Sequence, residues 1–450
     1  MLTQSQAKIV SWSAAGEEVC ASAARISTTQ GDALALFEKA QGNPRNQDLI
    51  GKVLRSGHRS VIEHAVFSIA LQNVSVYVEQ YFIERRLASF TVKSRRYVDF
   101  SGLGYYIPPE LEGKALAGYK SYMDGLFAAY QRLLDADVPK EDARFLLPYA
   151  FCSNFYCTLN ARELVSLIQS IRAGQGGAAP ELQDIAEQLA EQLNERFPAL
   201  GAELESALPA EPPAGESVPL FQEEPVWVSE GEAGAAELLA GPADPGRLLE
   251  QAHRAANPGG DKPFSVEALL RSRRPRELEQ LSYTFAVSDL TLAGITHLVR
   301  HRMQSVIVPP ISSVDHSRII LPETIRTNPA ALEIYQTALT EANRTGRTLC
   351  AEPALHPYGC YFAVAGNLMD VMTTLNAREL MLIVRLRTCT RAQWEIRHAA
   401  TGLLKLLRQQ YPALFDRFGP SCYLTGVCPE GRMSCGRQEE MRELFGGKLS

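Results

Sequence analysis

One five-residue string occurs twice in this sequence. Asn-Ala-Arg-Glu-Leu stands at residues 160–164 and again at 376–380, a separation of 376 − 160 = 216 residues. A second pair of similar segments, 83–89 and 299–305, has the same separation, since 305 − 89 = 216. Two motifs that share one offset predict a tandem duplication of a whole domain rather than a solenoid of short repeats. The alternative is two unrelated helix starts that share a string by chance, because short motifs recur easily.

The composition predicts a globular protein without membrane or export signals. The chain has 450 residues, enough for several domains, with 46% hydrophobic and 21% charged residues. It has no apolar run of membrane-spanning length, and residues 1–6 lack the basic and apolar parts of a signal peptide. The net charge of −6 gives no global attraction to nucleic acid, although a local basic site is compatible with it. Nine cysteines without an export signal favour free thiols in a reducing cytoplasm.

The order of the expected elements also repeats. In the first copy we expect two strand-like runs at 8–13 and 65–71, and helices at 74–87, 114–135, 160–172 and 181–195. The equivalent segments of the second copy are 226–229, 281–287, 290–302 and 331–345. Mixed strands and helices without βαβ alternation indicate an α+β fold that occurs twice. We expect the copies at 1–200 and 226–450, joined by an acidic, mostly extended Pro/Ala/Glu-rich linker at 201–225.

A basic cluster in the second copy is a candidate ligand site. Arg300, His301 and Arg302 lie together at the end of one expected helix. Arginine forks suit phosphate oxygens, and histidine can donate a hydrogen bond to a flat heteroaromatic ring. The alternative is a solvated basic helix end that the helix dipole favours.

A second group of arginines follows the second copy of the repeated string. The string begins an expected helix that ends with Arg385, Arg387 and Arg391. Helical spacing places Arg378, Arg385 and Arg391 near one side, which favours an anionic ligand. A solvated polar face is the alternative for this segment.

Other common sites are not apparent in the sequence. Cys422, Cys428 and Cys435 do not have the spacing of a zinc knuckle, and no fourth ligand lies nearby, so we expect no metal site. The common motifs of serine hydrolases, zinc proteases, P-loops and dinucleotide-binding turns are absent, and no nucleophile stands out. Aromatic residues are not interleaved with the arginines, which argues against nucleic-acid binding.

Taken together, these residues resemble the flavin-dependent thymidylate synthases. The family pattern has a histidine-rich element, then Arg-His-Arg followed by spaced serines and an arginine, and further on Asp-Ala-Arg before Leu-Pro. Asn-Ala-Arg, Leu-Arg and Ala-Gln-Trp-Glu-Ile come last. The same order and approximate spacing occur in both halves of this chain, apart from the linker.

Each copy departs from this pattern, and the departures are complementary. The first copy has Glu84-Arg85-Arg86 in place of Arg-His-Arg but keeps many other polar positions: His58, Ser60, Glu63, His64, Ser94, Arg96, Arg144, Asn160, Arg162 and, at the Leu-Arg position, Arg172. The second copy lacks the histidine element and has Cys360 in place of Arg144, but it keeps another set: Arg300, His301, Arg302, Ser305, Asn376, Arg378, Arg387 and Gln393 to Ile396. Both copies have a valine, Val92 or Val308, where the family commonly has an acidic residue.

The resemblance implies one composite site built from both copies. The nucleotide would be bound by Ser94, Arg96 and Arg144 of the first copy and by Arg300 and Arg387 of the second. Arg387 would be the catalytic residue, since it would stabilise negative charge on the pyrimidine. FAD would be bound by residues from both copies: Ser60, Asn160, Arg162, Arg300, His301, Arg302, Asn376 and Arg378. Which Asn-Ala-Arg string contacts the flavin stays open. A homodimer of two-copy chains would imitate the homotetramer of the family.

The resemblance also implies a reaction. It is the FAD-dependent reductive methylation of dUMP to dTMP, with methylenetetrahydrofolate as one-carbon donor and NADPH as reductant. Two alternatives remain, a related flavoenzyme for another pyrimidine nucleotide and a non-catalytic nucleotide-binding homologue. The complementary pattern of retained basic residues favours an enzyme.

Overall fold

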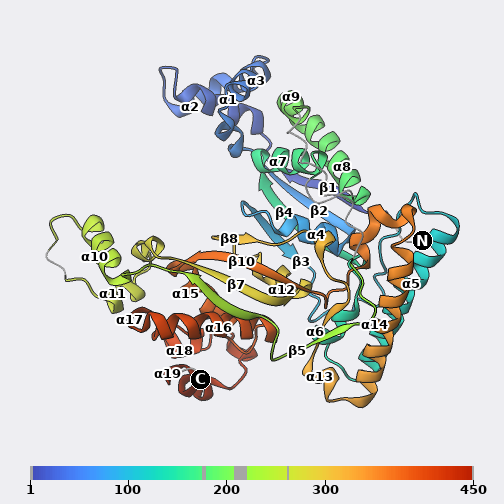
Figure 1. Cartoon of the computed structure of the whole chain (residues 1–450). Coiled ribbons are helices and arrows are strands. Elements are labelled where there is room, and N and C mark those ends of the chain that lie inside the picture. The colour runs from blue at the N-terminus through green and yellow to red at the C-terminus, as the bar shows by residue number, and fades with distance from the viewer. Residues whose placement is uncertain (1–3, 175–178, 207–219, 261–262, 448–450) are drawn as a thin grey trace. The chain divides into compact units, whose positions relative to one another are not determined.

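The computed structural model describes residues 4–174, 179–206, 220–260 and 263–447 (Figure 1). The chain divides into two compact units. The first contains residues 1–224, 310–317 and 328–365, and the second contains residues 225–309, 318–327 and 366–450. The first unit therefore includes one long helix and a following segment that belong, by sequence, to the second copy.

Each unit contains a four-stranded antiparallel sheet, and the two sheets have the same topology. The first has the order β1-β2-β4-β3, with strands Gln6–Trp12, Val66–Ser75, Cys152–Asn160 and Ala88–Val92. The second has the order β6-β7-β10-β8, with strands Ala235–Ala240, Ser282–Thr291, Leu368–Asn376 and Gln304–Ile307. A two-stranded parallel sheet pairs β5 (Val226–Ser229) with β9 (Arg318–Leu321). The predicted α+β fold in two tandem copies is thus confirmed.

The duplication extends to backbone detail. Asn73 and Asp289, which are 289 − 73 = 216 residues apart, both have a left-handed backbone, with φ of 53° and 54°. Asn and Asp tolerate this conformation better than most residues with a side chain. In each copy a side chain of the neighbouring strand accepts a hydrogen bond from that backbone N–H, Asn154 at 3.0 Å and Asp370 at 2.9 Å. Both irregularities therefore come from one ancestral strand pair.

Helices cover the sheets and connect the strands. The first copy contributes α1 (Gly16–Ile26), α2 (Ala33–Ala40), α3 (Asn46–Arg55), α4 (Val76–Ile83), α5 (Gly113–Asp135), α6 (Lys140–Ala143), α7 (Ala161–Arg172), α8 (Pro180–Arg196) and α9 (Gly201–Leu204). The second contributes α10 (Pro245–Ala256), α11 (Val266–Arg271), α12 (Leu292–Leu298), α13 (Glu323–Arg326), α14 (Pro329–Leu349), α15 (Ala377–Arg387), α16 (Trp394–Gln410), α17 (Pro412–Phe415), α18 (Ser421–Thr425) and α19 (Gln438–Gly446).

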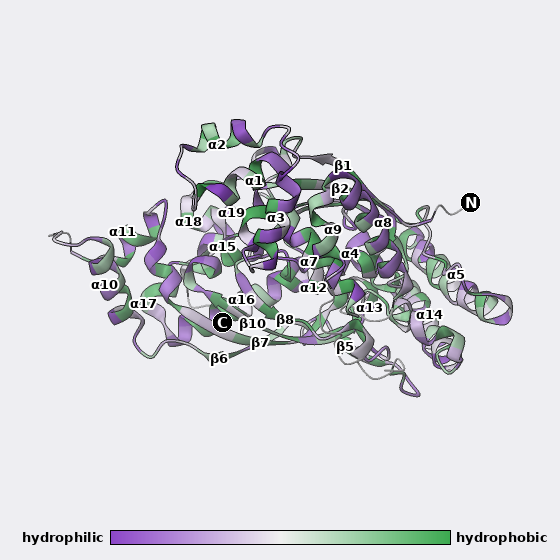
Figure 2. Cartoon of the chain, turned by 90° about the horizontal axis from the view of Figure 1, so that it is seen from above, coloured by the Kyte–Doolittle hydropathy of each residue, from purple (hydrophilic) through white to green (hydrophobic). Residues whose placement is uncertain are grey.

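The long helices of the two copies pack against each other inside the first unit (Figure 1). They are equivalent in sequence, since α5 begins at Gly113, α14 begins at Pro329, and 113 + 216 = 329. Green and purple residues are mixed along both helices, as expected when one face is buried and the other is solvated (Figure 2). A Cβ on Gly118 would lie 2.5 Å from a methyl of Leu349, so a larger residue there would require the Leu349 side chain to move.

A second contact of the same unit is reciprocal. The backbone N–H of Tyr149 donates to the carbonyl of Ala363 at 2.7 Å, and that of Ala365 donates to the carbonyl of Leu147 at 2.9 Å. The offsets are 363 − 147 = 216 and 365 − 149 = 216. Residue i of one copy thus contacts residue j of the other and the reverse, which is the arrangement of an isologous dimer interface.

Several sequence-based boundaries were wrong. The helices expected at 74–87 and 290–302 are the shorter α4 and α12, because strands β2 and β7 continue to Ser75 and Thr291. The hydroxyls of these two residues cap the helices by accepting from the N–H of Val78 and Gly294.

The predicted partner of the first strand was also wrong. Segment 226–229 forms β5, whereas β6 at 235–240 takes the place of β1 at the sheet edge. The predicted linker is not wholly extended, since Gly201–Leu204 forms α9 and Gln222 is bonded to Ser317 and Asp315. Residues 207–219 of that linker lie outside the described residues.

Glu181 joins three parts of the first unit. Its side chain is 1% exposed and accepts from the Ser5 hydroxyl at 2.7 Å, the Ser75 N–H at 2.8 Å and the Tyr361 hydroxyl at 2.9 Å. Burial raises the pKa of this carboxyl, while the three donors oppose the rise. Tyr361 comes from the second copy, so this carboxylate ties the two copies together.

We predict that Glu181→Ala lowers the free energy of unfolding of the first unit by at least about 3 kcal/mol, since it leaves three buried donors without their acceptor. Denaturant unfolding measures the change. The control is Glu191→Ala at an exposed position of the same helix, which should stay within about 0.5 kcal/mol of the wild type. Equal effects of the two substitutions would contradict the assigned role of Glu181.

Candidate active site

The Arg-His-Arg segment lies in the turn between α12 and β8 and not at the helix end that the sequence indicated. The physical reason is that α12 ends at Leu298, so the next residues turn toward the strand. His301 is 7% exposed, whereas Arg300 and Arg302 on either side of it are exposed. The turn therefore presents two guanidinium groups and buries the imidazole between them.

Helix α15 supplies the two partners of that imidazole. The helix begins directly after strand β10, where the side chain of Asn376 accepts from the N–H of Glu379 at 2.9 Å. The Arg387 Nε–H donates to His301 Nε2 at 2.9 Å, and His301 Nδ1 lies 3.3 Å from a carboxylate oxygen of Glu379. The first and last turns of α15 are thus linked through one histidine.

The charge of His301 follows from this environment. Burial lowers the pKa of His301 most strongly, the Arg387 cation lowers it further, and Glu379 raises it. The net shift is downward, so the imidazole is neutral at neutral pH. A neutral imidazole has one donor and one acceptor nitrogen, and the Arg387 N–H requires Nε2 to be the acceptor. The proton therefore lies on Nδ1 and faces Glu379.

The first copy has no equivalent of this arrangement. At the position of His301 stands Arg85, which donates to the hydroxyl of Tyr81 at 2.7 Å. At the position of Arg387, since 387 − 216 = 171, stands the buried Ile171. Only the glutamate is retained, as Glu163.

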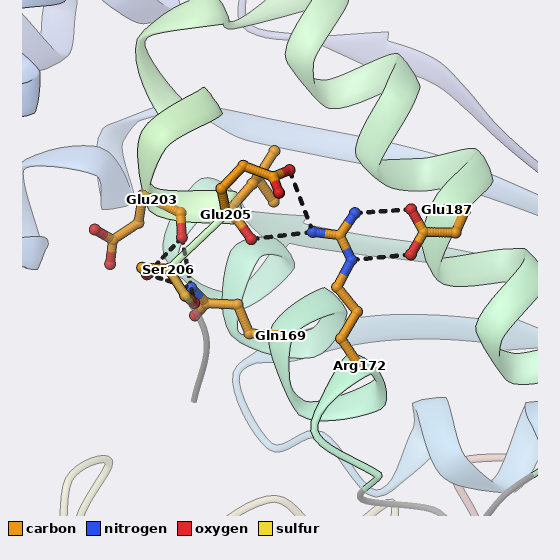
Figure 3. A network of polar contacts seen from close by, with 7 residues as sticks. Gln169, Arg172, Glu187, Glu203, Glu205 and Ser206 are labelled. Carbon is orange, nitrogen blue, oxygen red and sulfur yellow. Dashed lines mark hydrogen bonds and ion pairs between the residues drawn. The ribbon is translucent and has the colours of Figure 1, made fainter. Parts of the chain in front are cut away.

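Arg172 was expected at the Leu-Arg position, and the structure corrects this. Its guanidinium makes two hydrogen bonds with Glu187, at 2.9 and 2.7 Å, and a third with the carbonyl of Leu204 at 3.0 Å (Figure 3). Glu205 lies 3.7 Å away, and Gln169 bonds the end of α9 beside it. Arg172 thus joins α7 to α8 and α9, and it lies one residue beyond Ile171, the equivalent of Arg387.

The predicted nucleotide residues of the first copy meet around one glutamate. Arg96 Nε–H donates to the Glu141 carboxylate at 2.7 Å, and Arg144 Nε–H donates to the Glu141 carbonyl at 3.1 Å. Ser94 stands two residues before Arg96 and accepts from its backbone N–H at 3.4 Å. Arg144 is 2% exposed and Arg96 is partly exposed. Ser60 lies apart from this group, exposed in the 3-10 helix Arg59–His64.

Both Asn-Ala-Arg strings have the same local contacts. Asn160 caps α7 as Asn376 caps α15. Arg162 pairs with Glu63, and Arg378 pairs with Glu279 at the equivalent position, since 279 − 63 = 216. These side chains therefore stabilise the fold of each copy, and their predicted contact with flavin stays a prediction.

The expected convergence of arginines on α15 was wrong. Arg385 donates to the Ser421 hydroxyl at 3.0 Å, and Arg391 lies beyond the helix end and donates to the Met433 carbonyl at 2.9 Å. Arg378 pairs instead with Glu279. Arg385 and Arg391 both contact the C-terminal segment, and Arg391 departs from the helical spacing because α15 ends at Arg387.

Two acidic residues of the site were missed by the sequence analysis. Glu379 stands inside the repeated string, and Glu141 stands three residues before Arg144. Their spacing from the basic residues was the available signal, since acidic neighbours at helical spacing can orient a cation. A cavity of about 510 Å³ in the second unit is lined by other residues, Trp394, Arg397, His398, Arg437 and Glu440 among them.

The fold and the site define a duplicated α+β protein whose second copy carries a buried histidine hydrogen-bonded to a partly exposed arginine. Residues 8–199 and 235–413 match the Thy1 family, described as thymidylate synthase complementing protein. A flavin-dependent thymidylate synthase of Geobacter sulfurreducens is 32% identical over 172 residues, which are 37% of this chain and 74% of that protein. The one of Nitratidesulfovibrio vulgaris is 34% identical over 183 residues, which are 38% and 75%. The chain belongs to this family of flavin-dependent thymidylate synthases, which are methyltransferases.

One solved structure is also similar to part of the chain. It is a UMP/dUMP methylase from Streptomyces cacaoi bound with 5-Br dUMP, which is 26% identical and has a TM-score of 0.38. The alignment covers 44% of this chain and 96% of that one.

Two absences concern residues 4–174, 179–206, 220–260 and 263–447. Within them, no three His, Cys, Asp or Glu side chains are grouped so that they could hold a metal ion. Over the same ranges, no helix combines the length and the apolar character that crossing a bilayer requires. All nine cysteines are free thiols.

We predict that Asn376→Ala lowers the free energy of unfolding of the second unit by about 1 kcal/mol, because α15 loses its N-cap. Asn376→Asp keeps an acceptor for the N–H of Glu379 and should retain wild-type stability. Denaturant unfolding followed by circular dichroism measures both variants. Equal stability of the alanine and aspartate variants would contradict the capping role.

Proposed function

We propose that this chain is an FAD-dependent thymidylate synthase. It converts dUMP to dTMP with methylenetetrahydrofolate as the one-carbon donor and NADPH as the reductant. Membership of the Thy1 family supports the reaction class. The observation that supports a working site is the Arg387–His301–Glu379 arrangement, since a cation held by a neutral histidine is suited to stabilise charge on a ligand.

The nucleotide would be bound by basic residues of both copies. Ser94, Arg96 and Arg144 would hold its phosphate and sugar from the first copy, where Glu141 already holds both arginines. Arg300 of the second copy would add a guanidinium, because forked N–H groups match phosphate oxygens. Arg387 would stabilise the negative charge that develops on the pyrimidine oxygen during the reaction.

The exposed part of the Arg-His-Arg turn fits a flavin nucleotide. Arg300 and Arg302 present two cations on either side of the buried His301, as an anionic diphosphate group requires. Ser60 and the Asn-Ala-Arg residues, Asn160, Arg162, Asn376 and Arg378, would complete the flavin site. Bound FAD supplies the redox chemistry, while the protein supplies orientation and charge.

One such site per chain follows from the complementary losses. Arg144 has no basic equivalent in the second copy, and Arg300, His301 and Arg387 have no equivalents in the first. The isologous contact between residues 147–149 and 363–365 supports an internal dimer of copies. A homodimer of chains would then imitate a tetramer of single-copy subunits, in the reducing cytoplasm that nine free thiols suit.

One observation favours a second candidate, a flavoenzyme for another pyrimidine nucleotide. Val92 and Val308 replace the acidic residue that commonly stands in the nucleotide loop. Val92 ends strand β3 and Val308 directly follows β8, so this difference occurs at the same place in both copies.

A visible absorption spectrum of the purified protein tests the proposal. We predict a flavin band that shifts on addition of dUMP. Arg144→Ala and Arg387→Ala should each weaken dUMP binding about a hundredfold, because each removes a charged hydrogen bond from an anionic ligand. Arg172→Ala is the control, since its contacts with Glu187 and Leu204 lie outside the proposed site.

Three outcomes would argue against the proposal. Flavin without a dUMP response, but with a response to another pyrimidine nucleotide, would favour the second candidate. No flavin after reconstitution with FAD would exclude both enzyme functions and leave a non-catalytic homologue. Equal loss of binding in the Arg172 and Arg387 variants would remove the special role of Arg387.

A further inference from the structure

We propose that Glu379 is a positioning residue that acts on Arg387 through His301. The Glu379 carboxylate fixes the imidazole tautomer, and the imidazole fixes the guanidinium in the orientation that binds the nucleotide. The last step rests on the proposed function, whereas the hydrogen-bonded chain from Glu379 to Arg387 stands on its own geometry.

The hydrogen-bond chemistry allows only one direction for this chain. Arginine nitrogens are donors only, so His301 Nε2 must be an acceptor. The single proton of the neutral ring then lies on Nδ1, where the Glu379 oxygen at 3.3 Å accepts it. Without the carboxylate, the ring can take the other tautomer, in which Nε2–H and the Arg387 Nε–H oppose each other.

Burial strengthens the dependence of Arg387 on Glu379 and His301. The side chains of His301 and Glu379 are 7% and 8% exposed, so water does not easily replace either partner. A charged hydrogen bond at a buried site contributes more than one at the surface, and the loss of one partner costs more. The position of Arg387 therefore depends on a residue two helical turns away on the same helix.

The first copy provides a matched comparison. It retains the glutamate as Glu163, but the histidine and the arginine are replaced by Arg85 and Ile171. Glu163 therefore has the same place in the repeated string, but the first copy has no histidine and arginine at the positions of His301 and Arg387. Substitution of Glu163 reports the general effect of losing a glutamate at this helix start.

The hydrogen bonds from Glu379 through His301 to Arg387 also predict that nucleotide affinity depends on pH. The charged groups that act on His301 are Glu379 and Arg387 on α15, and Arg300 and Arg302 flank it in its own turn. The pKa of His301 lies below its usual value, so the ring stays neutral until the pH falls below about 6.5. Protonation then turns Nε2 into a donor and places a second cation beside Arg387. Nucleotide affinity should be constant at neutral pH and should fall on acidification through this pKa.

Titration of the flavin-containing protein with dUMP between about pH 5 and 8 is the first test. We expect Glu379→Ala to weaken binding about tenfold at neutral pH, while Glu163→Ala leaves it unchanged. Glu379→Gln should rescue binding because the amide oxygen can accept from Nδ1–H. Its acid limb should move to lower pH, since the carboxylate that raises the His301 pKa is gone.

His301→Gln separates positioning from titration. Its amide oxygen can accept from Arg387 and its amide N–H can donate to Glu379, but it does not titrate. We expect the acid limb of this variant, whatever its affinity at neutral pH, to shrink to the part that protonation of the nucleotide phosphate itself causes, since the phosphate has a second pKa of about 6. Equal binding by the Glu379→Ala and Glu163→Ala proteins, or an unchanged acid limb in His301→Gln, would overturn the proposal.

Nitrogen NMR of the histidine rings tests the chain without any nucleotide. The His301 signal is assigned by its absence in His301→Gln. We expect the Nδ1–H tautomer in the wild type and its loss in Glu379→Ala. If both tautomer results are found but dUMP does not bind, the proposed function is wrong, whereas the hydrogen bonds from Glu379 through His301 to Arg387 are supported. If the Nε2–H tautomer is found in the wild type, the chain itself is wrong.

Discussion

Two reciprocal backbone hydrogen bonds, from Tyr149 to Ala363 and from Ala365 to Leu147, join equivalent segments of the two copies. They connect residues far apart in the chain, yet they repeat one contact twice, as a two-fold interface does. The equivalent helices α5 and α14 pack in the same unit, and Glu181 accepts a hydrogen bond from Tyr361 of the other copy. The first unit therefore includes residues 328–365 of the second copy, and these contacts bind the two copies together within it.

This dependence explains how the copies could diverge in function while keeping one fold. Contacts that hold each sheet are retained at the 216-residue offset, such as Ser68 with Thr158 and Thr284 with Thr374. Residues of the proposed site are not retained in both copies. Ile171 and Arg85 replace the arginine and histidine of the second copy, and Cys360 replaces Arg144 of the first. If one site uses residues from both copies, a basic residue that one copy has lost can be supplied by the other copy.

The repeated string was enough to predict the duplication, because it marks the start of an asparagine-capped helix after the central strand of each copy. The α+β fold and the family also follow from local pattern. The boundaries at Ser75 and Thr291 could not be predicted, since apolar residues continue from strand into helix in both copies and the hydroxyl cap marks the change. Glu379 was overlooked because its partner His301 is 379 − 301 = 78 residues away and meets it only in the folded chain. Helix α14 packs with α5 in the first unit, although it belongs to the second copy by sequence. This contact joins distant parts of the chain, so no local sequence pattern predicts it.

The central claim is that two diverged copies make one nucleotide site per chain, and its most direct test is the binding stoichiometry. Isothermal titration of the flavin-loaded protein with dUMP, with chain concentration and flavin content measured independently, gives the number of sites. One dUMP and one flavin per chain are expected, because neither copy alone retains both Arg144 and Arg387. Two dUMP per chain would show that each copy binds nucleotide by itself, and that the missing residues were never shared.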